Sequence, residues 1–207
     1  NEQLKSLREE LSSTAMKQLG FLVITGQIDF SDMYLPKWHE AQNMKSALTA
    51  LEQVGGALAR EESLPEEYAS SAQEFWDSSV TKAPSAKGEF PPLAKAFSYW
   101  FKADSLEIDW RLTHFNKIIG SKPIEGIDIY GCLETLAHLY TSRPLETLKA
   151  TYKLVFVSQH KVELIWASKF LFSIAEQGLS STDLRVSAEA ESLRQRLALA
   201  GIRLPFE

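Results

Sequence analysis

The stretch FSYWFKADSLEIDWRLTHFN, residues 97–116, contains six aromatic side chains and three large aliphatic ones. Read as one continuous helix that runs to about residue 119, it has a core face of phenylalanine, leucine and isoleucine. A second apolar set falls on the opposite side of the wheel, namely Tyr99, Leu106 and Trp110. A helix that is apolar on two sides is either enclosed by its own domain or covered on the second side by a partner.

Both alternatives remain open for this stretch. Core aromatics are common, which favours enclosure within the domain. Tyr99 and Trp110 each carry a polar group that tolerates a half-wet site, and such residues are enriched at binding hot spots. The sequence therefore identifies Tyr99, Leu106 and Trp110 as the candidate partner-binding residues. The segment 154–175 is also apolar on all sides. Because only one helix easily occupies the centre of a domain of this size, having two such segments favours exposure of one face.

Most of the chain repeats this helical pattern, with apolar residues at steps of three and four. Only Phe21–Thr25, rich in β-branched residues, also suits a short strand. The pattern predicts an all-α, multi-helix bundle of seven or eight helices with little or no sheet, and a solenoid-like stack of helix pairs is one arrangement that it allows. The expected helices cover residues 2–23, 37–62, 63–79, the opening stretch to about 119, 127–142, one long helix or a pair over 145–177, and 181–200. Residues 181–183 can cap the last of these helices, and Gly201 is expected to stop it.

A length of 207 residues predicts a single domain over 1–207. The segment KAPSAKGEFPP at 82–92, with three prolines and a glycine, is the clearest loop and the possible boundary between two lobes. Gly55 and Gly56 interrupt the pattern of the second expected helix. Because glycine weakens a helix, we expect this pair to permit close approach of a neighbouring helix.

The net charge of −5 is unevenly distributed. Residues 1–67 carry 6 basic and 11 acidic side chains, whereas residues 142–207 carry 9 basic and 7 acidic ones. The acidic first third suits a basic protein partner, and the weak positive balance of the last third disfavours nucleic-acid binding. Four arginines lie on or beside the last expected helix and are interpreted as a solvated face, namely Arg185, Arg194, Arg196 and Arg203.

The chain has no apolar run of about 20 residues, so we expect a soluble protein without a membrane span. The single cysteine, Cys132, excludes a disulfide within the chain, which slightly favours the cytoplasm. Because the chain begins at Asn1 rather than Met, we expect a missing upstream segment, and the compartment stays open.

Candidate chemistry is sparse. Glu134 and His138 are one helical turn apart, and so are His160 and Glu163. These two pairs are the candidates for a metal site. Neither pair has the usual Glu-x-x-His spacing. Nucleotide-binding loops, serine-hydrolase elbows and Cys-x-x-Cys pairs are absent from the sequence, and no cofactor is expected.

These observations lead to three functional hypotheses. The first is a non-enzymatic helical protein that binds another protein by occlusion or scaffolding, as an inhibitor, an immunity-type antitoxin, a chaperone, an adaptor or an assembly subunit. The second is a helical enzyme whose site is assembled from distant residues, such as the four metal candidates. The third is a nucleic-acid-binding or nucleocapsid-like protein that uses the basic carboxy-terminal region.

Overall fold

The computed structural model describes Gln18 and five longer stretches of the chain. These stretches are residues 41–61, 65–81, 91–119, 126–158 and 161–202. The helix predicted over 2–23, apart from Gln18, and the possible strand at 21–25 lie outside the described residues.

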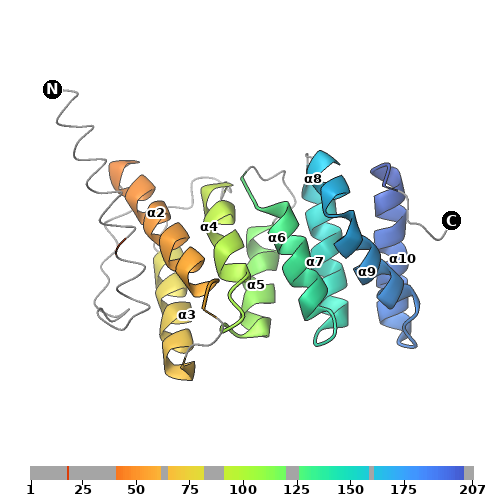
Figure 1. Ribbon diagram of the computed structural model, residues 1–207, viewed down its shortest axis with the longest axis horizontal. Helices are drawn as coiled ribbons and strands as arrows, with labels where there is room; N and C mark the ends of the chain where they lie inside the picture. Colours follow the sequence, from red (N-terminus) through yellow and green to blue (C-terminus); the bar gives the residue numbers. More distant parts are fainter. Residues whose placement is uncertain are drawn as a thin grey trace. The chain divides into compact units, whose positions relative to one another are not determined.

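Regular structure in the described residues consists of nine α-helices and no strand (Figure 1). The all-α prediction is confirmed, although seven or eight helices were expected. The nine helices are α2 (Ala41–Leu58), α3 (Glu66–Thr81), α4 (Pro91–Phe101), α5 (Ile108–Ile118), α6 (Ile129–Leu139), α7 (Pro144–Val157), α8 (Lys161–Trp166), α9 (Ser168–Leu179) and α10 (Leu184–Leu199). None of these described helices is long and apolar enough to cross a membrane.

The chain divides into two compact units, residues 1–107 and residues 108–207. The division falls after Glu107, between α4 and α5. The loop at 82–92 lies mostly outside the described residues. A lobe boundary in that loop, and a single domain over the whole chain, therefore stay predictions.

In the first unit, α2 packs closely on α4 because α2 carries a glycine where the two helices meet. A Cβ atom built on Gly55 would lie 2.7 Å from Nε1 of Trp100 and 3.0 Å from Cβ of Tyr99. Without that Cβ, the Trp100 indole reaches the α2 backbone and donates a 2.8 Å hydrogen bond to the carbonyl oxygen of Leu51. The predicted close approach at Gly55 is confirmed.

The core of the first unit also contains an aromatic cluster between α3 and α4. The ring centroid of Trp76 lies 5.1 Å from that of Phe97 and 5.1 Å from that of Trp100. Phe75 lies 6.4 Å from Trp100, and all four side chains are buried. Such pairs each contribute about 0.5–1.5 kcal/mol beyond the burial of their area.

The opening stretch forms two helices, so the prediction of one continuous helix is wrong. Successive i to i+3 hydrogen bonds end α4, with the amides of Lys102 and Ala103 donating to the carbonyls of Tyr99 and Trp100. Asp104 and Ser105 follow, and their short polar side chains favour turns over helix. A new helix, α5, begins at Ile108.

In the second unit, α7 contacts α5, α6, α9 and α10. The pairs α6–α7 and α9–α10 stack so that α6 contacts α9 and α7 contacts α10, which is how neighbouring helix pairs pack in a solenoid. A Cβ atom built on Gly178 of α9 would lie 2.6 Å from Cβ of Ala190, so α9 and α10 pack too closely there for a side chain at position 178. The long helix or pair predicted over 145–177 is three helices, α7, α8 and α9.

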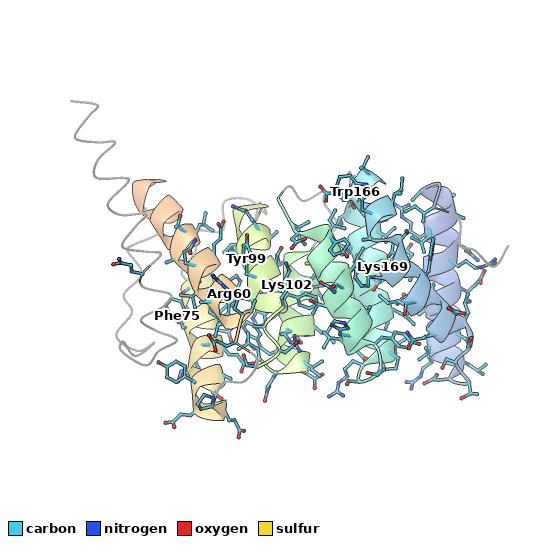
Figure 2. The ribbon with its side chains drawn as sticks, in the orientation of Figure 1. Arg60, Phe75, Tyr99, Lys102, Trp166 and Lys169 are labelled. Atoms are coloured by element: carbon cyan, nitrogen blue, oxygen red, sulfur yellow. The ribbon has the colours of Figure 1, made fainter. Side chains whose placement is uncertain are left out.

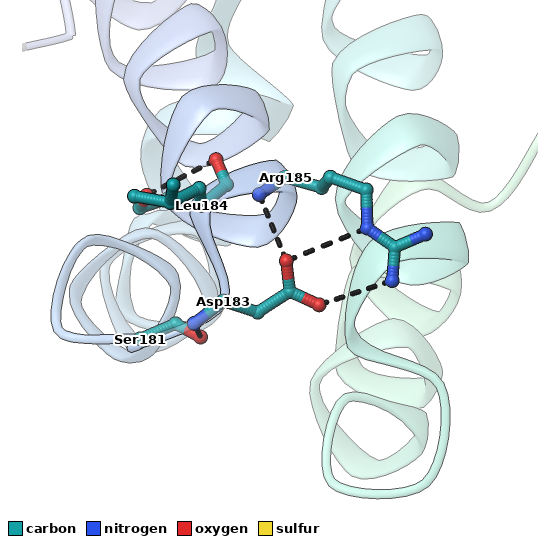
Figure 3. Close-up of polar contacts among 5 residues, drawn as sticks. Ser181, Asp183, Leu184 and Arg185 are labelled. Carbon is teal, nitrogen blue, oxygen red and sulfur yellow. Dashed lines mark hydrogen bonds and ion pairs between the residues drawn. The ribbon is translucent and has the colours of Figure 1, made fainter.

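Short polar residues begin two helices of the second unit. The carboxylate of Asp128 accepts a 2.9 Å hydrogen bond from the amide of Gly131 at the start of α6. The carboxylate of Asp183 accepts a 2.8 Å hydrogen bond from the amide of Arg185 at the start of α10 (Figure 3). Gly201, with a φ of 79°, follows α10, so the predicted cap and stop of this last helix are confirmed.

Candidate protein-interaction surface

The most apolar exposed face in the described part of the second unit lies on α8. Val162 and Ile165 are each 57% exposed, and Trp166 is 72% exposed. Spacings of three and four residues place these side chains on one side of the helix. We call Val162, Ile165 and Trp166 the α8 surface. Figure 2 shows Trp166 on α8 and Lys169 on the helix that follows.

The α8 surface is exposed because another set of residues attaches α8 and α9 to the rest of the unit. Leu164, Ala167 and Leu171 are all buried, at spacings of three and four residues. Ala167 is the single residue between the two helices, and the amide of Phe170 donates a 3.0 Å hydrogen bond to its carbonyl oxygen. This buried side therefore continues from α8 into α9 and leaves the opposite side of α8 uncovered.

Lys169 lies one turn beyond Trp166 and is held by two aromatic rings. Its Nζ lies 4.6 Å from the centroid of the Phe170 ring and 5.6 Å from that of Tyr130 on α6. The two rings meet edge to face with centroids 5.2 Å apart, and Tyr130 is 40% exposed. Lys169 itself is exposed and makes no ion pair with a carboxylate of the described residues. A cation thus lies at one end of the α8 surface.

The three residues identified from the sequence do not form one described surface. Leu106 is only 2% exposed, which removes its side chain from the surface. Tyr99 is partly exposed, and its ring lies beneath the ammonium of Lys102 at 5.8 Å. Trp110 is partly exposed and stacks on His114 with centroids 4.4 Å apart.

The helical wheel that grouped these three residues assumed a continuous helix. The break after α4 removes that assumption and leaves Tyr99 in the first unit and Trp110 in the second. Binding of a partner by Tyr99 and binding of a partner by Trp110 are therefore two separate predictions.

The metal candidates are only partly described. Glu134 and His138 lie on α6, Glu163 lies on α8, and these two helices are in contact. His160 lies outside the described residues. No group of three or more His, Cys, Asp or Glu side chains in the described stretches is arranged to hold a metal ion.

Each described arginine of the last helix has a partner within the chain. Arg185 pairs with Asp183 at 3.2 Å, and Arg194 pairs with Glu191 at 2.7 Å. Arg196 lies 4.6 Å above the ring of Phe156, and Arg203 is outside the described residues. The hydrogen bond with Asp183 raises the pKa of Arg185, and the same contact lowers the pKa of Asp183.

The acidic character of the first third extends into α3. This helix contains four acidic side chains and no lysine or arginine. The four are exposed, namely Glu66, Glu67, Glu74 and Asp77. An acidic helix of this kind attracts basic molecules over long range, but it does not by itself form a binding site.

No family model, curated protein or solved structure matches this chain. Function is therefore inferred from the α8 surface and the residues around it. The sequence singled out 154–175 as apolar on all sides but did not identify Val162, Ile165 and Trp166. Their signal was a second apolar series in the same segment, offset from the series at Leu164 and Leu171.

Proposed function

We propose that the protein is a non-enzymatic helical binding protein that engages another protein through the α8 surface, by occlusion or scaffolding. The observation that supports the proposal is the exposure of Trp166, 72%, beside two exposed β-branched side chains on the same side of α8. Single exposed apolar residues are common on folded proteins, whereas a contiguous apolar face indicates an interaction site.

The composition of the α8 surface suits protein binding. Tryptophan is among the residues most enriched at binding hot spots. Burying its side chain removes about 150–250 Å² from water, which contributes several kcal/mol before the cost of association is subtracted. Val162 and Ile165 have few rotamers, so little side-chain entropy is lost when a partner covers them.

The α8 surface is not needed to hold α8 in place. Leu164 and Ala167 are at most 1% exposed and already attach this helix to its unit. We therefore expect Trp166→Ala to leave the free energy of unfolding within about 0.5 kcal/mol of wild type. The same change should weaken partner binding by about 2 kcal/mol or more.

The experiment is affinity capture from the native source, followed by titration of the captured partner against wild type and variants. Leu184→Ala is the matched control, because Leu184 is 83% exposed on α10 and lies outside the α8 surface. Trp110→Ala tests the surface identified from the sequence. A partner that binds Trp166→Ala as tightly as wild type contradicts the proposal, and loss of binding with Trp110→Ala alone moves the site to α5.

A further inference from the structure

The cation beside the α8 surface restricts what can cover this surface. Val162, Ile165, Trp166 and Lys169 follow one another at steps of three, one and three residues, so the lysine extends the same exposed side across the junction at Ala167. The rings of Tyr130 and Phe170 hold its ammonium at 5.6 and 4.6 Å. A partner that covers Trp166 and continues along this side onto α9 also removes water from Lys169.

An ammonium that loses water needs a compensating group. Burying an unpaired charge is strongly unfavourable, and an aromatic face replaces only a small part of the lost hydration. None of the described carboxylates is paired with Lys169. A carboxylate supplied by the partner would compensate for this loss.

We propose, on the basis of the proposed function, that the α8 surface binds an acidic amphipathic segment of another protein, with apolar side chains on Trp166 and an Asp or Glu on Lys169. Glu163 is partly exposed near the amino-terminal end of α8 and repels a second carboxylate there.

A lipid surface fits these residues less well. Recognition of anionic lipids takes about 4–8 clustered basic residues. The described side chains beside Trp166 include one such cation, Lys169, together with the acidic Glu163. A helix of 6 residues also offers little apolar length for insertion into a bilayer.

The test uses the full chain and three helical peptides that share one leucine stripe and differ only in their flanking residues, which are Glu, Lys or Gln. Binding is measured by fluorescence anisotropy of the labelled peptides at low and at high salt. We expect the Glu peptide to bind about tenfold more tightly than the Lys peptide, with the Gln peptide between them. We also expect high salt to reduce this difference.

Two variants at Lys169 show whether this cation causes the preference. Lys169→Met keeps the apolar stem and removes the charge, so the affinities for the Glu and Lys peptides should become nearly equal. Lys169→Arg keeps the charge and should preserve the preference. A wild-type protein that binds all three peptides equally, through Trp166, overturns the acidic partner and leaves the proposed function intact.

Other outcomes overturn both proposals. Absence of peptide binding, or peptide binding that Trp166→Ala does not weaken, excludes the α8 surface as a protein-binding site. The α8 surface is also excluded as a protein-binding site if the protein does not bind the peptides but cosediments with phosphatidylserine-containing vesicles in a Trp166-dependent manner. A partner segment that is basic rather than acidic appears as preference for the Lys peptide and overturns the inference about charge.

Discussion

Gly55 and Gly56 are adjacent on α2, but only Gly55 lies where a side chain would collide with α4. A Cβ on Gly55 would collide with the Trp100 indole, whose Nε1 would lie 2.7 Å away. A Cβ on Gly56 would be 3.7 Å from Nη2 of Arg60 and 3.9 Å from Cδ1 of Tyr99, which are ordinary contacts. The contact between α2 and α4 therefore requires only one of the two glycines.

This difference makes a paired stability prediction. Gly55→Ala should lower the free energy of unfolding by about 1–3 kcal/mol, because the indole must shift and its hydrogen bond to Leu51 is strained or lost. Gly56→Ala should raise it by about 0.5–1 kcal/mol through the better helix propensity of alanine. Chemical denaturation of both variants measures the two effects. Equal effects of the two changes would contradict the packing seen at Trp100.

A second residue-scale prediction concerns pH and Asp183. The hydrogen bonds from the Arg185 side chain and backbone hold the pKa of Asp183 below its ordinary value. A carboxyl whose pKa is lowered by folding stabilises the protein above its unfolded pKa, and this contribution disappears as the pH falls through the folded pKa. Acidification should therefore weaken the start of α10.

Thermal unfolding of two variants between pH 7 and pH 2 tests the role of Asp183. Asp183→Asn keeps an oxygen that can cap α10 but removes the charge. Its melting temperature should therefore fall less than that of wild type as the pH is lowered. Asp183→Ala should melt lower than Asp183→Asn at neutral pH because it loses the cap as well. Identical melting of wild type and Asp183→Ala at neutral pH would show that the contact does not stabilise the helix.

At the scale of helices, the sequence predicted which segments are helical better than where helices break. Periodicity predicted α2, α3, α6 and α10, and the cap at Asp183 and the glycine at 201 marked the limits of α10 correctly. The break between α4 and α5 was missed because the apolar wheel continues through Asp104 and Ser105, and two polar residues do not disturb the periodicity. The junction at Ala167 was missed because alanine favours helix.

The candidate surface was predicted only at this coarse level. The sequence indicated that either the segment around Trp110 or the segment at 154–175 exposes apolar residues, since two all-round apolar helices do not both fit the centre of one domain. It did not identify Val162, Ile165 and Trp166. Which side of an apolar helix faces water depends on the neighbouring helices, and these contacts lie far apart in the sequence.

The contact between α9 and α10 provides a prediction at the same scale. Gly178→Ala should destabilise the protein by about 1–3 kcal/mol, because the new methyl group would meet Cβ of Ala190. Ala190→Gly alone should cost about 1 kcal/mol of helix propensity. The double variant should lose less than the sum of the two, because removing one methyl group makes room for the other. Additive losses in a double-mutant cycle would show that the two helices do not touch there.

At the scale of the whole molecule, each of the two units has a size typical of an independent domain. The first contains the Trp76–Trp100 cluster, and the second contains the stacked helix pairs around α7. We expect denaturant unfolding, followed by far-UV circular dichroism, to resolve two transitions. Gly55→Ala should shift one and Gly178→Ala the other. A single transition that both variants shift would establish one cooperative domain, as the length of the chain predicts.

The buried thiol of Cys132 on α6 has an experimental consequence. It is the chain's sole cysteine, it is 0% exposed, and it belongs to the second unit. A maleimide dye can alkylate it only after the surrounding helices separate. The rate of dye attachment to the native protein, divided by the rate for the denatured chain, therefore gives the equilibrium constant for opening of the second unit around Cys132. The measurement needs no engineered cysteine.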